Sequence, residues 1–439
     1  MKRTLTALPL LFAGLILTLT ILSFLYGCGN GPANNTVQAL PPTTQQIDPV
    51  IQWNRTLLAI LRAPAVPGDQ PATVHPTRSL AILHAAIYDA VNAVDQKHSA
   101  YLVGLQAPTA SPEAAASSAA HDILIALYPS QKAMLDTQLT QLLAQIPAGQ
   151  NKARGINVGQ IVAQRTLALR SNDGSDAKPL SFTPGMQPGD YQLTPPKFLL
   201  PVFTHWSQVK PFALTSANQF RSGPPPALTS LEYTAAFQET SALGEINSTT
   251  RTADQTQIAR FWSGKIQDYW NEIAQTAALS HNTGLVQNAR LFALLNLALA
   301  DDAIAFYDAK YTYHFWRPVT AIRSAASNTN PGTPANPNWS PLIDTPLDPS
   351  YPGAHSVISY SAATILSAYF GSDTFQYSVS SEVLPGVLRS FSSFSGAAEE
   401  AGLSRIYIGH HWRTDHNAGQ ELGRNIANYV LQNYLVPTG

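Results

Sequence analysis

The chain has 439 residues, of which 45% are hydrophobic and only 12% are charged. This length and apolar share are enough for one large core or two smaller ones. The formal net charge of −1 provides no basic field of the kind that nucleic-acid binding requires, so we expect no nucleic-acid partner.

The first 28 residues have the pattern of an export segment. Lys2 and Arg3 precede a largely apolar stretch, and the run that ends at Cys28 resembles a bacterial lipobox. Cys28 is the only cysteine, so we expect lipidation there and no internal disulfide. Residues 1–28 therefore predict a signal or lipoprotein segment and an exported, membrane-anchored protein in the periplasm or at the cell surface. An uncleaved anchor helix is the alternative, because the stretch is long enough to span a bilayer.

Changes in composition divide the rest of the chain. Residues 29–50 are rich in Asn, Thr, Pro and Gln, which is typical of a polar tether. Residues 51–175 have helical periodicity, whereas prolines interrupt residues 176–230 and predict an irregular connector. Residues 231–439 return to a helical pattern. We expect an all-α fold, in which a C-terminal bundle carries the functional site.

Local patterns predict individual helices. Leu80 and Ile87 belong to a series of apolar residues with a period of 3.6, which places His84 near the packed face as a core histidine. Thr252 and Gln255 have the spacing of a capping box that opens a helix.

A long helix predicted from about residue 286 carries two cations near its end. Lys310 and Arg317 are seven residues apart, which on a helix places them about 10 Å apart along the axis and on nearly the same face. Their long side chains could then converge on one anion. Pro318 discourages continuation of the helix. A solvated stripe of charges is the alternative.

The next segment reads as a helix N-terminus. Residues 356–370 have a helical pattern, and Gly371 is a typical residue at a helix C-terminus. The N–H groups of Gly353 and Ala354 would point outward at the positive end of the helix dipole, which favours an anion. His355 is well placed there for proton transfer, and a surface or capping role is its alternative.

A third segment contains Arg405, His411 and Asp415. His411 and Asp415 are four residues apart, or one turn on a helix face. A carboxylate in that position accepts one ring N–H and makes the other nitrogen a better ligand or nucleophile. Gly409 permits a close approach of the backbone. An ordinary polar helix face is the alternative for the His411 and Asp415 pair.

Together the three segments bring three cations and two histidines to a protein with few charges, which points to one small oxyanion. Arginine binds an oxyanion in a bidentate way and lysine acts as a compact charge, a combination that suits phosphate or a phosphate analogue. The segments resemble the signature of the vanadium-dependent haloperoxidase and type 2 phosphatidic-acid phosphatase superfamily: Lys-x6-Arg-Pro, then Pro-Ser-Gly-His, then Ser-Arg-x3-Gly-x-His-x3-Asp. The first and third blocks match at every defining position: Lys310, Arg317, Pro318, Ser404, Arg405, Gly409, His411 and Asp415.

The resemblance extends to bacterial vanadium haloperoxidase-like proteins and covers most of the chain from about residue 50. It implies vanadate as the cofactor, with hydrogen peroxide, a halide and a small organic acceptor as substrates. Bromide or iodide is favoured over chloride. His411 would be the axial ligand to vanadium, and His355 the acid–base residue. The oxygens of vanadate would be held by Lys310, Arg317, Arg405 and the backbone at Gly353 and Ala354.

Phosphate in the same pocket implies a different enzyme. The alternative is an exported acid phosphatase, in which His411 would form a phosphohistidine and His355 would protonate the leaving alcohol of a phosphomonoester. A third possibility is a non-catalytic exported lipoprotein. No later apolar run approaches membrane-spanning length, which argues against an integral lipid phosphatase.

The second block departs from the superfamily pattern. Gly353 and Ala354 stand where relatives usually carry Ser-Gly, so a hydroxyl donor is missing. Ser350 or Ser356 could supply a replacement.

Two further positions bear on the entrance to the site. Seven residues before His355, where resembling enzymes often carry Phe or His, this chain has Asp348. A carboxylate that pointed inward would repel halide. Trp339, in a proline-rich loop, is expected to line the entrance.

Overall fold

The computed structural model describes residues 48–325 and 328–438. The export segment 1–28, including Cys28, and nearly all of the tether 29–50 lie outside the described residues. Within the described ranges, no helix combines the length and the apolar character that crossing a bilayer requires. The predicted lipidation, export and membrane anchoring therefore stay predictions.

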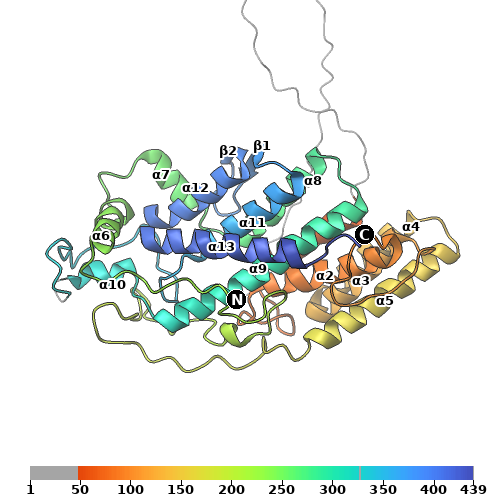
Figure 1. Cartoon of the computed structure of the whole chain (residues 1–439), viewed down its shortest axis with the longest axis horizontal. Helices are drawn as coiled ribbons and strands as arrows, with labels where there is room; N and C mark the ends of the chain where they lie inside the picture. The colour runs from red at the N-terminus through yellow and green to blue at the C-terminus, as the bar shows by residue number, and fades with distance from the viewer. Residues whose placement is uncertain (1–47, 326–327, 439) are drawn as a thin grey trace, which may run out of the picture. The chain divides into compact units, whose positions relative to one another are not determined.

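Helices dominate the described residues, so the predicted all-α class is confirmed (Figure 1). The α-helices are α1 (Pro49–Arg62), α2 (Pro76–Asp95), α3 (Pro112–Leu127), α4 (Lys132–Ala144), α5 (Gln150–Arg170), α6 (Leu231–Gly244), α7 (Ala253–Phe261), α8 (Ile266–Ser280), α9 (Leu285–Tyr313), α10 (Pro318–Arg323), α11 (Ala354–Phe370), α12 (Phe394–Tyr407) and α13 (Arg413–Asn433). Two short 3-10 helices are η1 (Pro129–Gln131) and η2 (Trp206–Gln208). The strands are β1 (Thr374–Ser380) and β2 (Leu388–Ser393), which pair in antiparallel fashion.

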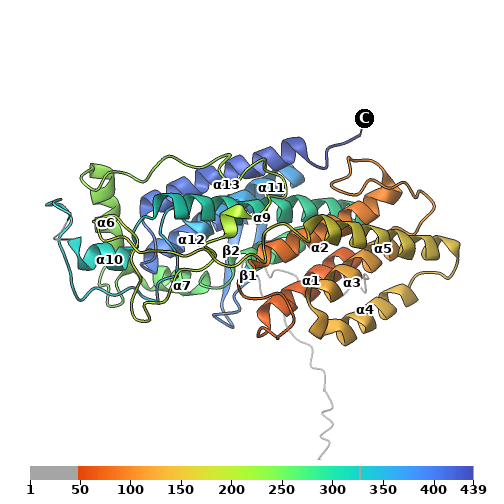
Figure 2. The same cartoon turned by 90° about the horizontal axis from the view of Figure 1, so that it is seen from below.

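Helix α9 lies at the centre of the core. It packs against α2 from the N-terminal region and against α11 and α13 from the C-terminal region, and both views show it between these two groups (Figure 1 and Figure 2). Almost every residue of α9 from Asn288 to Lys310 is buried. One apolar cluster contains residues of α2, α9, α11 and α13. The predicted domain boundaries at residues 175 and 230 remain predictions, since helices on both sides share this core.

A pair of asparagine side chains lies inside the contact between α8 and α9. Asn271 and Asn296 are fully buried, and each donates an amide N–H to the side-chain oxygen of the other at 2.9 Å. Each also donates to the backbone carbonyl four residues earlier, that of Gln267 or Phe292. The two amides satisfy each other in a place where an unpaired polar group would cost about 1–3 kcal/mol.

The connector is fixed to α9 by one carboxylate. Asp301 is completely buried and accepts the backbone N–H groups of Phe212, Ala213 and Leu214 at 2.6, 2.7 and 2.7 Å. Over residues 176–230, the described chain contains no helix longer than η2, in keeping with its many prolines. The irregular connector therefore follows a defined path along the helix that carries Lys310.

Two glycines allow α13 to lie unusually close to α11. A Cβ atom at Gly423 would lie 2.1 Å from the carbonyl oxygen of Val357, and one at Gly419 would lie 2.7 Å from the Cβ atom of Ser356. Both distances are far below van der Waals contact, so no larger residue fits without a backbone shift. This close packing holds the N-terminus of α11 beside the first turn of α13.

Several local predictions are confirmed. Thr252 and Gln255 form the predicted capping box of α7. His84 is buried and its Nε2 atom lies 2.8 Å from Asn54 Oδ1, as expected of a core histidine. Helix α11 ends at Phe370, and Gly371 follows in the left-handed region at φ +72°.

The predicted single helix through Lys310 and Arg317 is wrong. Helix α9 ends at Tyr313, and His314 takes a left-handed conformation with φ 48°. Arg317 is extended, with φ −81° and ψ 153°, and caps the short helix α10. The physical reason is Pro318, which occupies the first position of α10 and disfavours a helical conformation in the residue before it.

Candidate active site

Lys310 and Arg317 nevertheless converge, on the carboxylate of Asp348. Arg317 Nη2 pairs with Asp348 Oδ1, and Arg317 Nε donates to the Asp348 carbonyl oxygen at 2.8 Å. Lys310 Nζ lies 3.4 Å from Asp348 Oδ2. All three residues are buried. Asp348 therefore points inward, toward the cations, an orientation that the sequence alone did not decide.

The charge of Asp348 and those of Lys310 and Arg317 stabilise one another. Burial alone would raise the pKa of Asp348, but the charges of Lys310 and Arg317 outweigh it and hold that pKa below its ordinary value. Burial lowers the pKa of Lys310 to about 8, against the opposing effect of Asp348. The ammonium also donates to the carbonyls of Pro349 and Ser350. Near neutral pH the lysine is mostly a cation and the aspartate an anion.

Arg405 is the third cation, and its bonding is incomplete. It lies in the last turn of α12, and its Nη2 atom lies 2.7 Å from His410 Nδ1. Its Nε and Nη1 atoms are buried and have no hydrogen-bond partner among the described residues. Burial lowers the pKa of Arg405 to about 9, with Arg317 adding to the effect. Buried guanidinium donors without partners are costly, so their arrangement favours an anion as a partner.

His411 is poised as an acceptor. Its Nδ1 atom lies 2.9 Å from Asp415 Oδ2, and its Nε2 atom lies 3.0 Å from Arg317 Nη1. Burial, followed by the charges of Arg317 and Lys310, lowers the pKa of His411 well below 6.5, so the ring is neutral. With its proton on Nδ1, facing the carboxylate, His411 has a lone pair on Nε2 that suits a metal ligand or a nucleophile.

The predicted contact between His411 and Asp415 is present, but the predicted shared helix face is wrong. His411 lies before α13, and Asp415 is in the first turn of that helix, where its Oδ2 atom accepts the Trp412 N–H at 3.2 Å. Asp415 Oδ2 also accepts the hydroxyl of Ser350. Burial raises the pKa of Asp415 to about 6, against these hydrogen bonds. The pair is therefore held by a helix cap rather than by a shared helix face.

The N-terminus of α11 supplies backbone donors and the second histidine. Gly353 donates its N–H to the Asp415 carbonyl at 2.9 Å, so this amide is engaged within the protein. The N–H of Ala354 begins the helix and makes no hydrogen bond within the described part of the chain. Of the two predicted backbone donors, Ala354 thus fits the role and Gly353 does not.

His355 lies at the edge of the cluster. Its Nε2 atom lies 2.9 Å from the carbonyl oxygen of Trp262, so Nε2 carries the proton when the ring is neutral. Burial, followed by the charge of Arg405 and then those of Lys310 and Arg317, lowers the pKa of His355 well below 6.5. Negative charge placed among these cations would oppose that effect. Such a coupling is what an acid–base group beside an oxyanion requires.

Neither nearby serine is free to replace the missing hydroxyl. Ser350 donates to Asp415, and Ser356 Oγ lies 2.9 Å from His416 Nδ1. Gly353 itself has φ −76° and ψ 109°, a conformation open to any L-amino acid. A Cβ atom there would lie 3.3 Å from the Asp415 carbonyl oxygen, a tight contact that requires a small adjustment.

Gly353→Ser is therefore expected to tighten vanadate binding roughly tenfold. The added hydroxyl can give one charge-assisted hydrogen bond, worth about 1.5–3 kcal/mol, and the slight crowding at the Cβ atom offsets part of it. Titration of wild type and variant with orthovanadate measures the effect. Unchanged or weaker binding by a variant that melts normally would show that the hydroxyl is turned away, toward the first turn of α11.

One contributor was missed and one was misplaced by sequence reasoning. The Nδ1 atom of His410 contacts Arg405 Nη2, and its Nε2 atom lies 2.9 Å from the carbonyl oxygen of Ile343. The His410 ring therefore holds the guanidinium of Arg405 in place. Its position directly before His411 was the available signal. Trp339, expected at the entrance, is fully buried and donates its indole N–H to Ser241 at 3.0 Å. It packs beside Gly409, whose φ of +84° confirms the need for glycine there.

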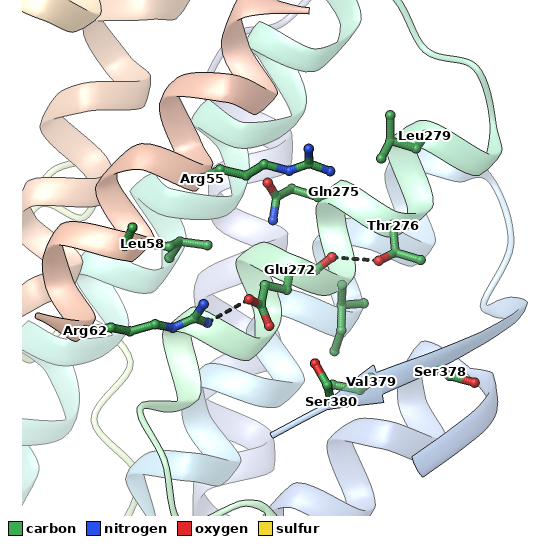
Figure 3. A pocket seen from close by; sticks show the side chains of 12 residues that line it. Arg55, Leu58, Arg62, Glu272, Gln275, Thr276, Leu279, Ser378, Val379 and Ser380 are labelled. Carbon is green, nitrogen blue, oxygen red and sulfur yellow. Dashed lines mark hydrogen bonds and ion pairs between the residues drawn. The ribbon is translucent and has the colours of Figure 1, made fainter. Parts of the chain in front are cut away.

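A separate cavity of about 390 Å³ lies between α1, α8 and β1 (Figure 3). Arg62 pairs with Glu272 at 2.8 Å on its wall, and Arg55 and Gln275 also line it. None of its lining residues belongs to the cluster of Lys310, Arg317, Arg405 and His411. This cavity is therefore distinct from the buried cluster.

Comparisons with known proteins agree with the geometry of the cluster. Residues 290–436, which contain every signature residue, match the family described as the VCPO second helical-bundle domain. The chain is 26% identical to the protein in the crystal structure of the first bacterial vanadium-dependent iodoperoxidase, with a TM-score of 0.74 over 89% of this chain and 97% of that one. The chain is vanadium haloperoxidase-like.

Two further similarities extend this result. The haloperoxidase-like chain is 24% identical to the vanadium chloroperoxidase of Curvularia inaequalis over 490 residues, covering 85% of this chain and 80% of that protein. The holo-type bacterial vanadium-dependent chloroperoxidase is 15% identical, with a TM-score of 0.66 over 81% of this chain and 90% of that one, and supports the fold alone. The predicted superfamily and the predicted enzyme class are confirmed.

The donors of the haloperoxidase-like chain fit vanadate. The unpaired Nε and Nη1 atoms of Arg405 and the N–H of Ala354 can meet its oxygens, and the neutral Nε2 atom of His411 can meet its metal. Imidazole nitrogen and cationic donors are the groups that a small metal oxyanion requires. Residues that would hold the cofactor are thus Lys310, Arg317, Ala354, Arg405 and His411.

Proposed function

We propose that the chain is a vanadate-dependent haloperoxidase that oxidises a halide with hydrogen peroxide to hypohalous acid. One observation carries the proposal: Arg405 has two buried donors without partners among the described residues, in the same cluster as a neutral histidine whose Nε2 atom faces Arg317. The similarity to vanadium haloperoxidases over most of the chain supports the same activity.

Each residue of the site has its own role in this reaction. When bound, vanadate supplies Lewis-acid activation of hydrogen peroxide without changing its own oxidation state. Lys310, Arg317 and Arg405 balance the negative charge, and Asp415 keeps the proton of His411 on Nδ1. The overall reaction consumes one proton for each halide oxidised, since peroxide and halide give hypohalous acid and water. His355 is the group that holds and transfers this proton.

We also propose that iodide or bromide is preferred to chloride. Asp348 adds a negative charge beside Lys310 and Arg317, and Gly353 removes a donor that would strengthen activation of peroxide. Both features reduce the positive character of the site. Iodide and bromide are easier to oxidise than chloride, so a less activating site still suffices for them.

An acid phosphatase is the second candidate, because the same lone pair on His411 Nε2 can attack phosphorus. One experiment separates the two. Purified protein is incubated with orthovanadate, hydrogen peroxide and iodide, bromide or chloride, and in parallel with a chromogenic phosphomonoester without vanadate. We expect halogenation that depends on vanadate. Phosphomonoester turnover with no vanadate-dependent halogenation would overturn the proposal in favour of the phosphatase.

We further propose, from residues 1–28 alone, that the protein acts outside the cytoplasmic membrane as a lipoprotein anchored through Cys28. Hypohalous acid is a reactive product, and release outside the cytoplasm is compatible with it.

A further inference from the structure

We infer that Asp348 is a built-in competitor for the oxyanion site, a carboxylate that neutralises two of its three cations and must yield them when the oxyanion binds. This inference rests on the proposed function. It concerns the affinity of that same site for oxyanions.

The carboxylate contacts both cations directly. Asp348 Oδ1 pairs with Arg317 Nη2, and Asp348 Oδ2 lies 3.4 Å from Lys310 Nζ. An incoming oxyanion needs the same donors, because lysine and arginine are the groups that neutralise its oxygens. The two negative groups therefore exclude or repel each other at the site.

The third cation shows that the cluster is incomplete when Asp348 is in place. Arg405 makes no ion pair with Asp348, and its Nε and Nη1 atoms lack partners within the described residues. Asp348 thus satisfies part of the cluster and leaves the rest open. An oxyanion can meet the free donors of Arg405 first and then compete for Lys310 and Arg317.

A second buried carboxylate, that of Asp173, pairs with two arginines, and its network serves as a comparison. Asp173 accepts from Arg78 Nε at 2.8 Å and from Arg170 Nε at 3.0 Å. The remaining nitrogens of both arginines are bonded to Gln70 and to the backbone carbonyls of Arg170, Lys210 and Pro211. No guanidinium donor remains unbonded in that network of described residues, whereas the Asp348 cluster leaves two.

The surroundings of Asp348 that the structure describes offer no other cation to hold it. Its charge is felt by His75, Tyr191, Tyr307 and Tyr311, in addition to the site cations. His75 lies among the rings of Phe203, Trp206, Phe306 and Tyr307 and is neutral, because burial lowers its pKa to about 4. Asp348 therefore depends on the same two cations that an oxyanion requires, and competition between them is direct.

The test is oxyanion binding by the full chain, measured calorimetrically with orthovanadate and separately with inorganic phosphate. Asp348→Asn keeps the size of the side chain and removes its charge. We expect Asp348→Asn to bind both oxyanions at least tenfold more tightly than wild type. The matched control is Asp173→Asn, which makes the same change in a buried two-arginine pair and is expected to leave both affinities within about twofold while lowering the melting temperature.

The outcomes separate this inference from the proposed function. If wild type binds both oxyanions and Asp348→Asn binds them equally or more weakly, the inference is overturned, since Asp348 then positions the cations rather than competing. If wild type and variant bind neither oxyanion, the proposed site fails and the inference fails with it. Asp348→Ser is the second neutral variant, used in the same titrations if the asparagine variant does not fold.

Discussion

Vanadate is expected to be lost from His411→Ala and retained by His355→Ala, whose turnover is expected to fall by about two to four orders of magnitude. His411 presents the Nε2 lone pair at the centre of the cluster, 3.0 Å from Arg317 Nη1. Its removal would take away the ring nitrogen that we propose as the metal ligand. His355 lies at the edge, bonded to Trp262, and removing it leaves the cations and His411 in place.

Vanadium content and halogenation rate are measured on both variants after gel filtration in the absence of free vanadate. Arg154→Lys is a suitable control, since Arg154 lies on α5 and donates to the side chains of Thr109 and Gln150. Equal vanadium content in the two histidine variants would contradict the assigned roles. So would a His355→Ala protein with wild-type turnover.

Gly423→Ala is expected to destabilise the protein by about 3 kcal/mol, although alanine is normally the better helix former by about 1 kcal/mol. The new methyl group would lie 2.1 Å from the Val357 carbonyl oxygen, a backbone atom that cannot turn aside. Helices α11 and α13 must then separate. Because they carry His355 and Asp415, activity is expected to fall together with stability.

Urea unfolding of wild type, Gly423→Ala and Gly223→Ala measures this effect. A Cβ atom at Gly223 would meet no other atom within 4 Å, and the φ of this glycine is outside the left-handed region, so its alanine variant is expected to unfold like wild type. A Gly423→Ala protein as stable as wild type would show that the two helices are less tightly fixed than their glycine contact indicates.

That the proposed site residues come together could be predicted from the sequence because their spacing is a chemical signature, but their backbone settings could not. Lys310 and Arg317 were expected on one helix face, and they meet instead across a turn in which His314 is left-handed. The proline after Arg317 signalled an end to the helix but not where the end falls. The convergence of the side chains depends on the loop at Asp348, which is distant in sequence.

Partners chosen by tertiary packing were also beyond sequence reasoning. Ser350 and Ser356 were equally plausible as replacements for the missing hydroxyl, and the fold commits them to Asp415 and His416. The orientation of Asp348 was left open for the same reason. Which hydrogen bond a polar side chain makes depends on neighbours that the chain brings from far away.

The hairpin of β1 and β2 was missed, although its signal was present. Phe375, Tyr377 and Val379 alternate with polar residues, which is the period of a strand with one buried face. The rings of Phe375 and Tyr377 pack against Phe394 at the start of α12. This strand has only seven residues and lies between long helical segments, so its alternation is a weak signal in the sequence.

The asparagine pair between α8 and α9 fixes the alignment of the helix that carries Lys310. If α9 slid by one turn along α8, or rotated about its axis, both amides would face apolar side chains, at a cost of about 1–3 kcal/mol for each polar group left unsatisfied. The apolar surface of α9 would tolerate such a shift, since leucine and alanine recur along it. Asn296 and Lys310 lie on the same rigid helix, so the single alignment that pairs Asn296 with Asn271 also sets the direction in which the lysine emerges. The amide pair thus fixes the alignment of α9 within the apolar interior. It thereby fixes the position of the Lys310 charge, about four turns away along the same helix.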